Sequence, residues 1–162
     1  MKKVAIEPLT PETFKPYGEY ISLLQTGNGH GFYPDLVQLP LGATAVPTVG
    51  LARVGNERVA SMLEYHCYTA EGFMPMDGDC VFFAGSPVPG DPFAAELHAF
   101  LVQKGTFVRL NPGVIHGAQF AVNRDSVDVL LLLPAFTFGN DTEFVMLHGD
   151  ACIEIVGSEG TA

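Results

Sequence analysis

The sequence predicts an all-β protein, and three observations support this fold class. The chain of 162 residues contains 18 Gly and 12 Pro, a content that suits a turn-rich β protein better than a helical bundle. Its residues are 48% hydrophobic and only 16% charged, which excludes an intrinsically disordered chain. From Thr44 onward, short apolar runs alternate with turn residues, a pattern typical of a sandwich or a small barrel.

A short helix is expected near the N-terminus, before these apolar runs begin. Thr10 is a good helix N-cap, Pro11 suits the first helical position, and Glu12 adds an acidic side chain to the first turn. Pro16 and Gly18 should end this helix after one or two turns. The residues from 21 to 40 contain Gly and Pro at short intervals, so we expect them to wind across the surface.

Six or seven strands of four to eight residues are expected in the rest of the chain. The apolar runs that predict them are Val46–Val54, Val59–Tyr68, Cys80–Ala84, Leu97–Val102, Phe107–Leu110, Gly117–Val122 and Val127–Leu133. The residues after about Phe144 could add one more strand. A chain of this length can bury a core of its own, so we expect one domain at residues 1–157 and a flexible C-terminal tail at 158–162.

The charge balance excludes two classes of partner. Eight Lys and Arg stand against 18 Asp and Glu, so the net charge of −10 repels nucleic acid and anionic membranes. The longest apolar run, Val129–Phe136, falls short of the ~20 residues of a membrane span, and the apolar stretch at the N-terminus is too short for a signal peptide. Cys67, Cys80 and Cys152 form no CxxC pair, so no disulfide framework or thiolate zinc site is indicated and we expect a cytoplasmic protein.

Side chains that suit a metal ion occur in two short segments. Glu64 and His66 lie two positions apart on a predicted strand and so project to the same face, and Glu71 follows five residues later. His116 comes after a tight turn at Pro112-Gly113 that would place it at the head of the next strand. Such a set suits Mn, Fe, Ni or Zn. The alternative is that both glutamates are solvated edge residues and His66 is a hydrogen-bonded, half-buried histidine.

Together, these segments resemble the two motifs of the cupin superfamily, a double-stranded β-helix barrel. The residues that carry the resemblance are His66, Glu71, Gly78, Pro112, Gly113 and His116. The first cupin motif normally begins with two histidines two positions apart, and Glu64 here takes the place of the first one. The resemblance implies an all-β, cupin-like barrel with a short N-terminal helix.

A narrower resemblance, to the ureidoglycolate lyase family, covers most of the chain. Its five motifs, in order, are Leu9-Thr10-Pro11-Glu12-x-Phe14-x-Pro16-Tyr17-Gly18-x-x-Ile21, Leu63-Glu64-x-His66, Phe73-x-Pro75-Met76-x-Gly78, Leu97-x-Ala99-Phe100 leading to Gly105, and Pro112-Gly113-Val114-x-His116. The resemblance implies a cupin-like homodimer and a carbon–nitrogen lyase that splits ureidoglycolate into glyoxylate and urea during allantoin degradation in purine metabolism.

The resemblance also implies roles for particular residues. Expelling urea requires removal of a proton from the substrate hydroxyl and delivery of a proton to the departing nitrogen. Glu64, His66 and His116 would hold a divalent ion (Ni, Mn, Zn or Fe), with Glu71 as a fourth metal ligand or as the proton acceptor. If no metal binds, His66 or His116 could act as the base directly. The catalytic candidates are therefore His66, Glu71 and His116.

A small anionic metabolite is the expected ligand, so a cation should meet its carboxylate. Arg53 is the favoured candidate, and the alternative is a surface charge that aids solubility. Tyr17 and Phe73 could line the mouth of the barrel, although aromatic residues in a β core usually fill space. Ile115 stands where the family usually has Trp, and Glu71 where it commonly has an amide. These departures favour an alternative function, a metal-dependent cupin isomerase or epimerase of a sugar or sugar acid. A further alternative is a non-catalytic ligand-binding cupin.

Overall fold

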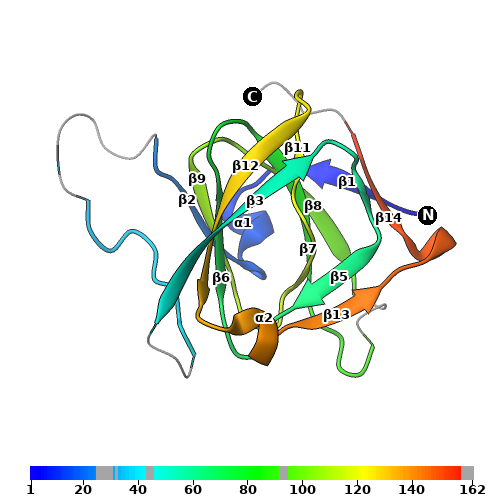
Figure 1. The fold of residues 1–162 in the computed structure, drawn as a ribbon. Helices are drawn as coiled ribbons and strands as arrows, with labels where there is room; N and C mark the ends of the chain where they lie inside the picture. Colours follow the sequence, from blue (N-terminus) through cyan, green and yellow to red (C-terminus); the bar gives the residue numbers. More distant parts are fainter. Residues whose placement is uncertain (25–30, 32, 43–45, 92–94, 158–162) are drawn as a thin grey trace.

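Two β-sheets face each other and close around a common interior in the computed structural model of the chain, which describes residues 1–24, 31, 33–42, 46–91 and 95–157 (Figure 1). The smaller sheet contains, in spatial order, β2 (Gly18–Ser22), β9 (Thr106–Leu110), β6 (Glu71–Pro75), β12 (Ser126–Pro134) and β3 (Pro47–Gly55). The larger sheet contains β13 (Glu143–Met146), β5 (Met62–Tyr65), β10 (Ile115–His116), β7 (Cys80–Gly85), β8 (Leu97–Val102), β1 (Lys2–Glu7), β14 (Ile153–Val156) and β4 (Val59–Ala60), and β11 (Phe120–Ala121) pairs with β7. The all-β prediction is therefore confirmed.

Large apolar side chains fill the interior between the sheets. Phe73 of β6 and Phe82 of β7 are fully buried, and their rings meet edge to face with centroids 4.9 Å apart. Because side chains alternate along a strand, Phe82 and Ala84 point into this interior, whereas Val81 and Phe83 point to the other face of the larger sheet. Full burial of one such ring stabilises a fold by roughly 1.5–3 kcal/mol. This packing holds in place the strands that carry the polar residues described below.

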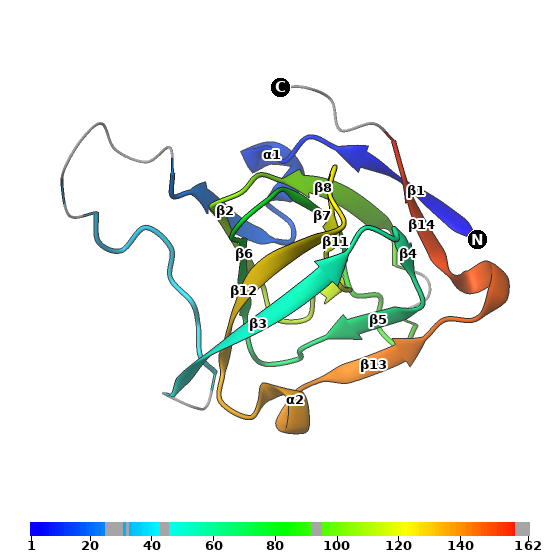
Figure 2. The same ribbon diagram turned by 45° about the horizontal axis from the view of Figure 1, so that its top comes forward.

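The other face of the larger sheet is covered by strands from the same sheet. β1, β14 and β4 lie at its far end and curl back over it (Figure 2). Val4, Ala60 and Ile155 from these strands share one buried apolar cluster with Phe83 and Ile115. The larger sheet is therefore buried on both faces along much of its width.

The predicted N-terminal helix is present as α1 (Pro11–Phe14). Thr10 Oγ1 accepts a hydrogen bond from the N–H of Thr13 (3.2 Å), and Thr13 Oγ1 accepts one from the N–H of Thr10 (3.0 Å). Phe14 is 1% exposed and packs edge-on against Phe100, with ring centroids 5.4 Å apart. The helix thus anchors the chain to the core just before β2. A second short helix, α2 (Thr137–Asn140), connects β12 to β13 (Figure 1).

Several strands differ from their predicted ranges. Leu97–Val102 is β8 as expected, but the run Val59–Tyr68 is divided into β4 and β5, and the run Gly117–Val122 contains only the two residues of β11. β6 was not predicted, because Glu71, Gly72 and Pro75 have low strand propensity. The strands that were divided or missed include those that carry the polar residues described below.

No helix within the described residues is long and apolar enough to cross a membrane. The predicted flexible tail at 158–162 lies outside the residues that the structure describes. The tail, like the domain boundary before it, stays a prediction.

Candidate functional site

Four polar side chains converge where the two sheets meet. Glu64 of β5 lies directly opposite His116 of β10, so their side chains share a face of the larger sheet. His66 follows the last residue of β5, and Glu71 begins β6 in the smaller sheet. One possible ligand atom from each of the four residues lies within 4.8 Å of the others. The two sequence segments that were expected to meet therefore do so, and their four side chains are called the cluster below.

The cluster is almost completely shielded from solvent. His66, His116 and Glu71 are 2%, 3% and 5% exposed, and the side chain of Glu64 is 15% exposed. His66 Nε2 lies 3.0 Å from Glu71 Oε2 and 3.5 Å from Glu64 Oε1. Glu71 is thus not the solvated edge residue of the alternative interpretation. The side chain of Glu64 is the member of the cluster that reaches solvent most.

The hydrogen-bond partners of His66 fix which ring nitrogen faces the cluster. Nδ1 lies 2.9 Å from the carbonyl oxygen of Asp141 and 3.2 Å from Oγ1 of Thr142. The carbonyl can only accept, and the Thr142 hydroxyl donates its proton to the carbonyl of Thr137 (3.0 Å). Nδ1 therefore carries a proton, and in the neutral ring Nε2 presents its lone pair to the cluster.

His116 has the same orientation, with one difference. Its Nδ1 donates to the carbonyl of Val114 (2.9 Å). Its Nε2 is buried and makes no hydrogen bond to any residue that the structure describes, although oxygens of Glu64 and Glu71 lie 3.4 and 3.3 Å away. Such an atom, facing two carboxylates, is suited to binding a ligand.

The four groups stabilise one another's charged forms. Burial alone would raise the pKa of Glu64, but His116 and His66 outweigh it and lower that pKa to about 2. Burial alone would lower the pKa of both histidines, but the two glutamates outweigh it, raising the pKa of His66 to about 9 and that of His116 to about 10. The pKa of Glu71 is lowered against its burial, first by the charge of His116. Without a metal, the cluster is therefore two carboxylates and two imidazoliums at neutral pH.

The expected turn before His116 ties the two segments together. Gly113 has φ +82°, a conformation that glycine adopts without strain. Its N–H donates a hydrogen bond of 2.6 Å to the carbonyl oxygen of His66. The turn that leads into β10 is therefore hydrogen-bonded directly to His66, and this bond fixes the position of His116 relative to His66.

The structure does not bring Arg53 to the cluster. Its guanidinium forms two hydrogen bonds to the carboxylate of Asp128, at 2.7 and 2.8 Å, and its side chain is 71% exposed. On β12, Asp128 lies opposite Arg53. Leu132, four positions further along β12, lies opposite Gly72, the neighbour of Glu71. These positions on β12 are roughly 13 Å apart. The expected contact between Arg53 and a substrate carboxylate is thus not supported, because Arg53 lies far from the cluster and Asp128 accepts hydrogen bonds from its Nε and Nη2.

The two aromatic candidates lie in the core. Tyr17 is 6% exposed and packs against His98, with ring centroids 5.9 Å apart. Phe73 is on the same face of β6 as Glu71, but it is fully buried against Phe82. Both side chains are therefore packed in the core, and their proposed contact with the substrate stays a prediction.

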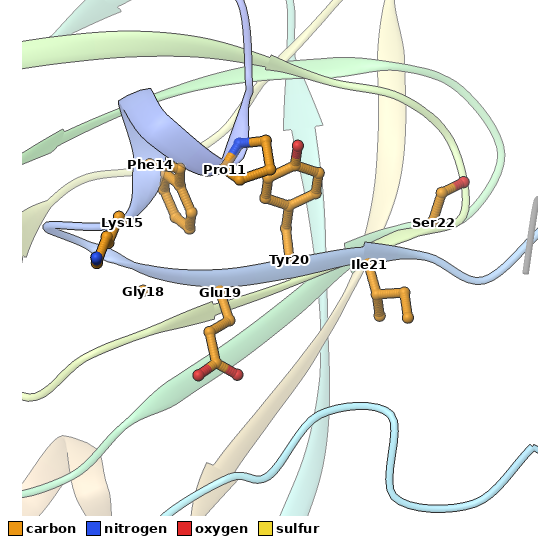
Figure 3. A pocket seen from close by; sticks show the side chains of 8 residues that line it. All are labelled: Pro11, Phe14, Lys15, Gly18, Glu19, Tyr20, Ile21 and Ser22. Atoms are coloured by element: carbon orange, nitrogen blue, oxygen red, sulfur yellow. The ribbon is translucent and has the colours of Figure 1, made fainter.

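A separate cavity of about 510 Å³ lies beside β2 (Figure 3). Its lining residues are Pro11, Phe14, Lys15, Gly18, Glu19, Tyr20, Ile21 and Ser22. Figure 3 shows Tyr20 pointing toward α1, and Glu19 and Ile21 pointing to the opposite side of the strand. No cluster residue lines this cavity, so the cavity is separate from the cluster.

Sequence reasoning missed three residues around His66. Asp141 and Thr142 contact its ring from 75 and 76 positions away, and neither has a local signal because they follow a short helix as ordinary turn residues. Phe138 of α2 is 59% exposed, and its ring meets that of His66 edge to face with centroids 6.5 Å apart. An exposed aromatic residue beside a polar cluster is a feature that only the fold reveals.

Comparison with known proteins extends over nearly the whole chain. The family model described as ureidoglycolate lyase matches residues 1–154. A putative ureidoglycolate lyase of Agrobacterium fabrum is 27% identical over 126 residues, which cover 72% of this chain and 74% of the relative. A ureidoglycolate lyase of Pseudomonas fluorescens is 24% identical over 138 residues, which cover 76% of this chain and 80% of the relative.

A solved structure shares the fold. The dTDP sugar isomerase of Desulfovibrio desulfuricans has a TM-score of 0.56 to this chain at 15% identity, and the match covers 83% of this chain and 85% of that one. This likeness, together with the two facing sheets, confirms the cupin-like fold. Since the family model matches residues 1–154 of 162, the chain belongs to the ureidoglycolate lyase family.

Proposed function

We propose that the protein is a ureidoglycolate lyase, which cleaves the carbon–nitrogen bond of ureidoglycolate and releases glyoxylate and urea. Family membership supports the substrate. The observation that carries the proposal within the structure is the buried cluster of Glu64, His66, Glu71 and His116, because paired carboxylates and imidazoles can both accept and deliver protons.

The reaction needs two proton transfers and no net proton. The central carbon of ureidoglycolate bears a hydroxyl, a carboxylate and a urea nitrogen. As the carbon–nitrogen bond breaks, the hydroxyl loses its proton and becomes the aldehyde carbonyl, while the departing nitrogen gains a proton. His66 and His116 can exchange protons only through Nε2, because each Nδ1 is bonded to a backbone carbonyl. Glu71 lies between the two Nε2 atoms, which suits it to accept the hydroxyl proton.

We also propose that the cluster holds a divalent cation (Ni, Mn, Zn or Fe). Two Nε2 atoms face two carboxylates, the Nε2 of His116 has no other partner in the described structure, and two glutamates balance the charge of the ion. Glu64, His66 and His116 would be ligands, with Glu71 as a fourth ligand or as the proton acceptor. When bound, such a cation supplies Lewis acidity that lowers the pKa of the substrate hydroxyl.

The assay that tests this function measures glyoxylate and urea released from ureidoglycolate. We expect turnover that is lost after treatment with a chelator and restored by one of the four ions. The absence of glyoxylate with every ion would refute the lyase. Full turnover by verified metal-free protein would refute the metal only. Thermal-shift measurements with sugar acids then test the isomerase alternative, because the right ligand stabilises the folded chain.

We further propose a cytoplasmic homodimer. Three cysteines without disulfides support the location. Val49 and Leu51 on the outer face of β3 are 71% and 63% exposed, and they lie opposite half-buried Leu132 and Leu130 of β12. A second copy that covers this apolar face would remove it from water.

Light scattering should give roughly twice the chain mass of 17.4 kDa, and Leu51→Asp should give the monomer mass. A wild-type monomer would contradict this assembly.

A further inference from the structure

The carboxylate of Asp141 holds the turn that follows His66. Its Oδ1 accepts a hydrogen bond from the N–H of Cys67 (2.8 Å), and its Oδ2 accepts from the N–H of Tyr68 (3.0 Å) and from Oγ1 of Thr69 (2.8 Å). One side chain thus binds three consecutive residues. Hydrogen bonds to an ionised acceptor are roughly twice as strong as those between neutral groups.

This turn connects two members of the cluster that belong to different sheets. His66 ends the segment from the larger sheet, and Glu71 begins β6 of the smaller sheet only five positions later. The path between them decides whether His66 Nε2 and Glu71 Oε2 come to 3.0 Å. Asp141 fixes that path from outside the cluster.

The backbone of the same residue orients the imidazole. The carbonyl of Asp141 accepts the Nδ1–H of His66 at 2.9 Å, with Thr142 Oγ1 as a second acceptor at 3.2 Å. The carbonyl of His66 itself is held by Gly113. The position of Asp141 therefore sets the orientation of the His66 ring. The hydrogen bonds from residues 67–69 to the Asp141 carboxylate fix that position.

We propose that Asp141 is a positioning residue for the cluster, acting through His66 and Glu71 without touching the substrate. The inference rests on the proposed function in one respect, which is that the cluster binds the ion and exchanges the protons. Partners that orient a ligand from behind typically change metal affinity or activity by 10–100-fold when removed.

Asp79 supplies a matched control. Its Oδ1 accepts a hydrogen bond of 2.8 Å from the N–H of Lys104, and it is half-buried like Asp141. It therefore secures backbone in the same way, but it is not a member of the cluster and contacts none of its residues among the described contacts. Asp79→Ala and Asp141→Ala each remove an acid that secures backbone, and only Asp141→Ala does so at the cluster.

The experiment compares wild type, Asp141→Ala, Asp141→Asn and Asp79→Ala well below the lowest unfolding temperature. Cobalt(II) affinity is measured by competition with a chelator, and kcat and KM are measured with ureidoglycolate. A third measurement needs neither metal nor turnover: the NMR signal of the Nδ1 proton of His66, assigned by its loss in His66→Gln. We expect Asp141→Ala to weaken cobalt affinity and to lower kcat 10–100-fold with little change in KM, and to lose the proton signal to exchange with water.

Asp141→Asn retains one acceptor oxygen, so its cobalt affinity and kcat should lie between those of wild type and Asp141→Ala. It replaces Asp141→Ala in the comparison if the alanine protein does not fold. Asp79→Ala should keep wild-type values in all three measurements. The proposal is overturned if Asp141→Ala matches Asp79→Ala in cobalt affinity and in the Nδ1 signal. If wild type binds cobalt but does not turn over ureidoglycolate, the proposed function fails. The cobalt affinity of Asp141→Ala then still tests the role of Asp141. If wild type binds no cobalt, the Nδ1 signal decides.

Discussion

Replacing His116 by alanine should lower kcat/KM for ureidoglycolate by about 10²- to 10⁴-fold. His116 is 3% exposed, and its Nε2 is one of two buried side-chain atoms that find no hydrogen-bond partner in the described residues. Whether this nitrogen binds the ion or moves a proton, its loss leaves the carboxylates of Glu64 and Glu71 without one of their two cationic neighbours. Steady-state kinetics with ureidoglycolate measure the effect.

His116→Gln keeps most of the side-chain volume and serves as a second variant if the alanine protein is unstable. His148→Ala is the control, because His148 is exposed between β13 and β14. The control should retain wild-type kinetics within about threefold, well inside the effect of one positioned acid or base. Activity of His116→Ala above a tenth of the wild-type value, in a protein shown to be folded, would exclude His116 from the chemistry.

The metal-free protein should be most stable in mildly acidic solution. The pKa values of His66 and His116 are raised from 6.5 to about 9 and about 10, so their contribution is fully present below pH 6.5 and is lost as pH rises through 9 and 10. The pKa of Glu64 is lowered from 4.5 to about 2, so its contribution is present above pH 4.5 and is lost as pH falls toward 2. The cluster therefore stabilises the fold most between pH 4.5 and 6.5.

Urea unfolding in the presence of a chelator measures this profile. We expect the free energy of unfolding to fall by several kcal/mol between pH 6.5 and 10, because the folded chain keeps two protons that the unfolded chain loses. Glu71→Gln removes one carboxylate that raises both histidine pKa values, so its profile over this range should be flatter. Excess zinc should reverse the trend, because two protons must leave before the ion binds. If the free energy of unfolding of the metal-free wild type, measured with the chelator present, rises with pH up to pH 9, the charge state assigned to the cluster is contradicted.

The fold class and the family could be predicted from the sequence because both depend on local patterns. Strand alternation places Glu64 and His66 on one side, and the turn at Pro112-Gly113 leads into the strand of His116, so these side chains meet as expected. Their metal-binding and catalytic roles stay predictions. Short motifs in a particular order predicted the family, and the match of the family model to residues 1–154 confirms it.

What escaped prediction depends on strand register and long-range contacts. Arg53 was a reasonable partner for an anion until the pairing of β3 with β12 placed Asp128 beside it. Asp141 gives no local sign of its role, because its bonds to Cys67 span 74 positions. β6 was missed for a different reason, since Glu71 begins a strand that tertiary packing imposes on residues of low strand propensity.

The parallel pairing of β1 with β14 has a consequence for how the protein folds. Lys2 lies opposite Ile153, so β1 meets β14, one of its two neighbours, across about 150 positions of the chain. Contacts of such long sequence separation slow folding, because the chain must close a large loop before they form. Until β14 has formed and docked, this edge of β1 stays open, and an open strand edge is where the folding chain should need protection from aggregation.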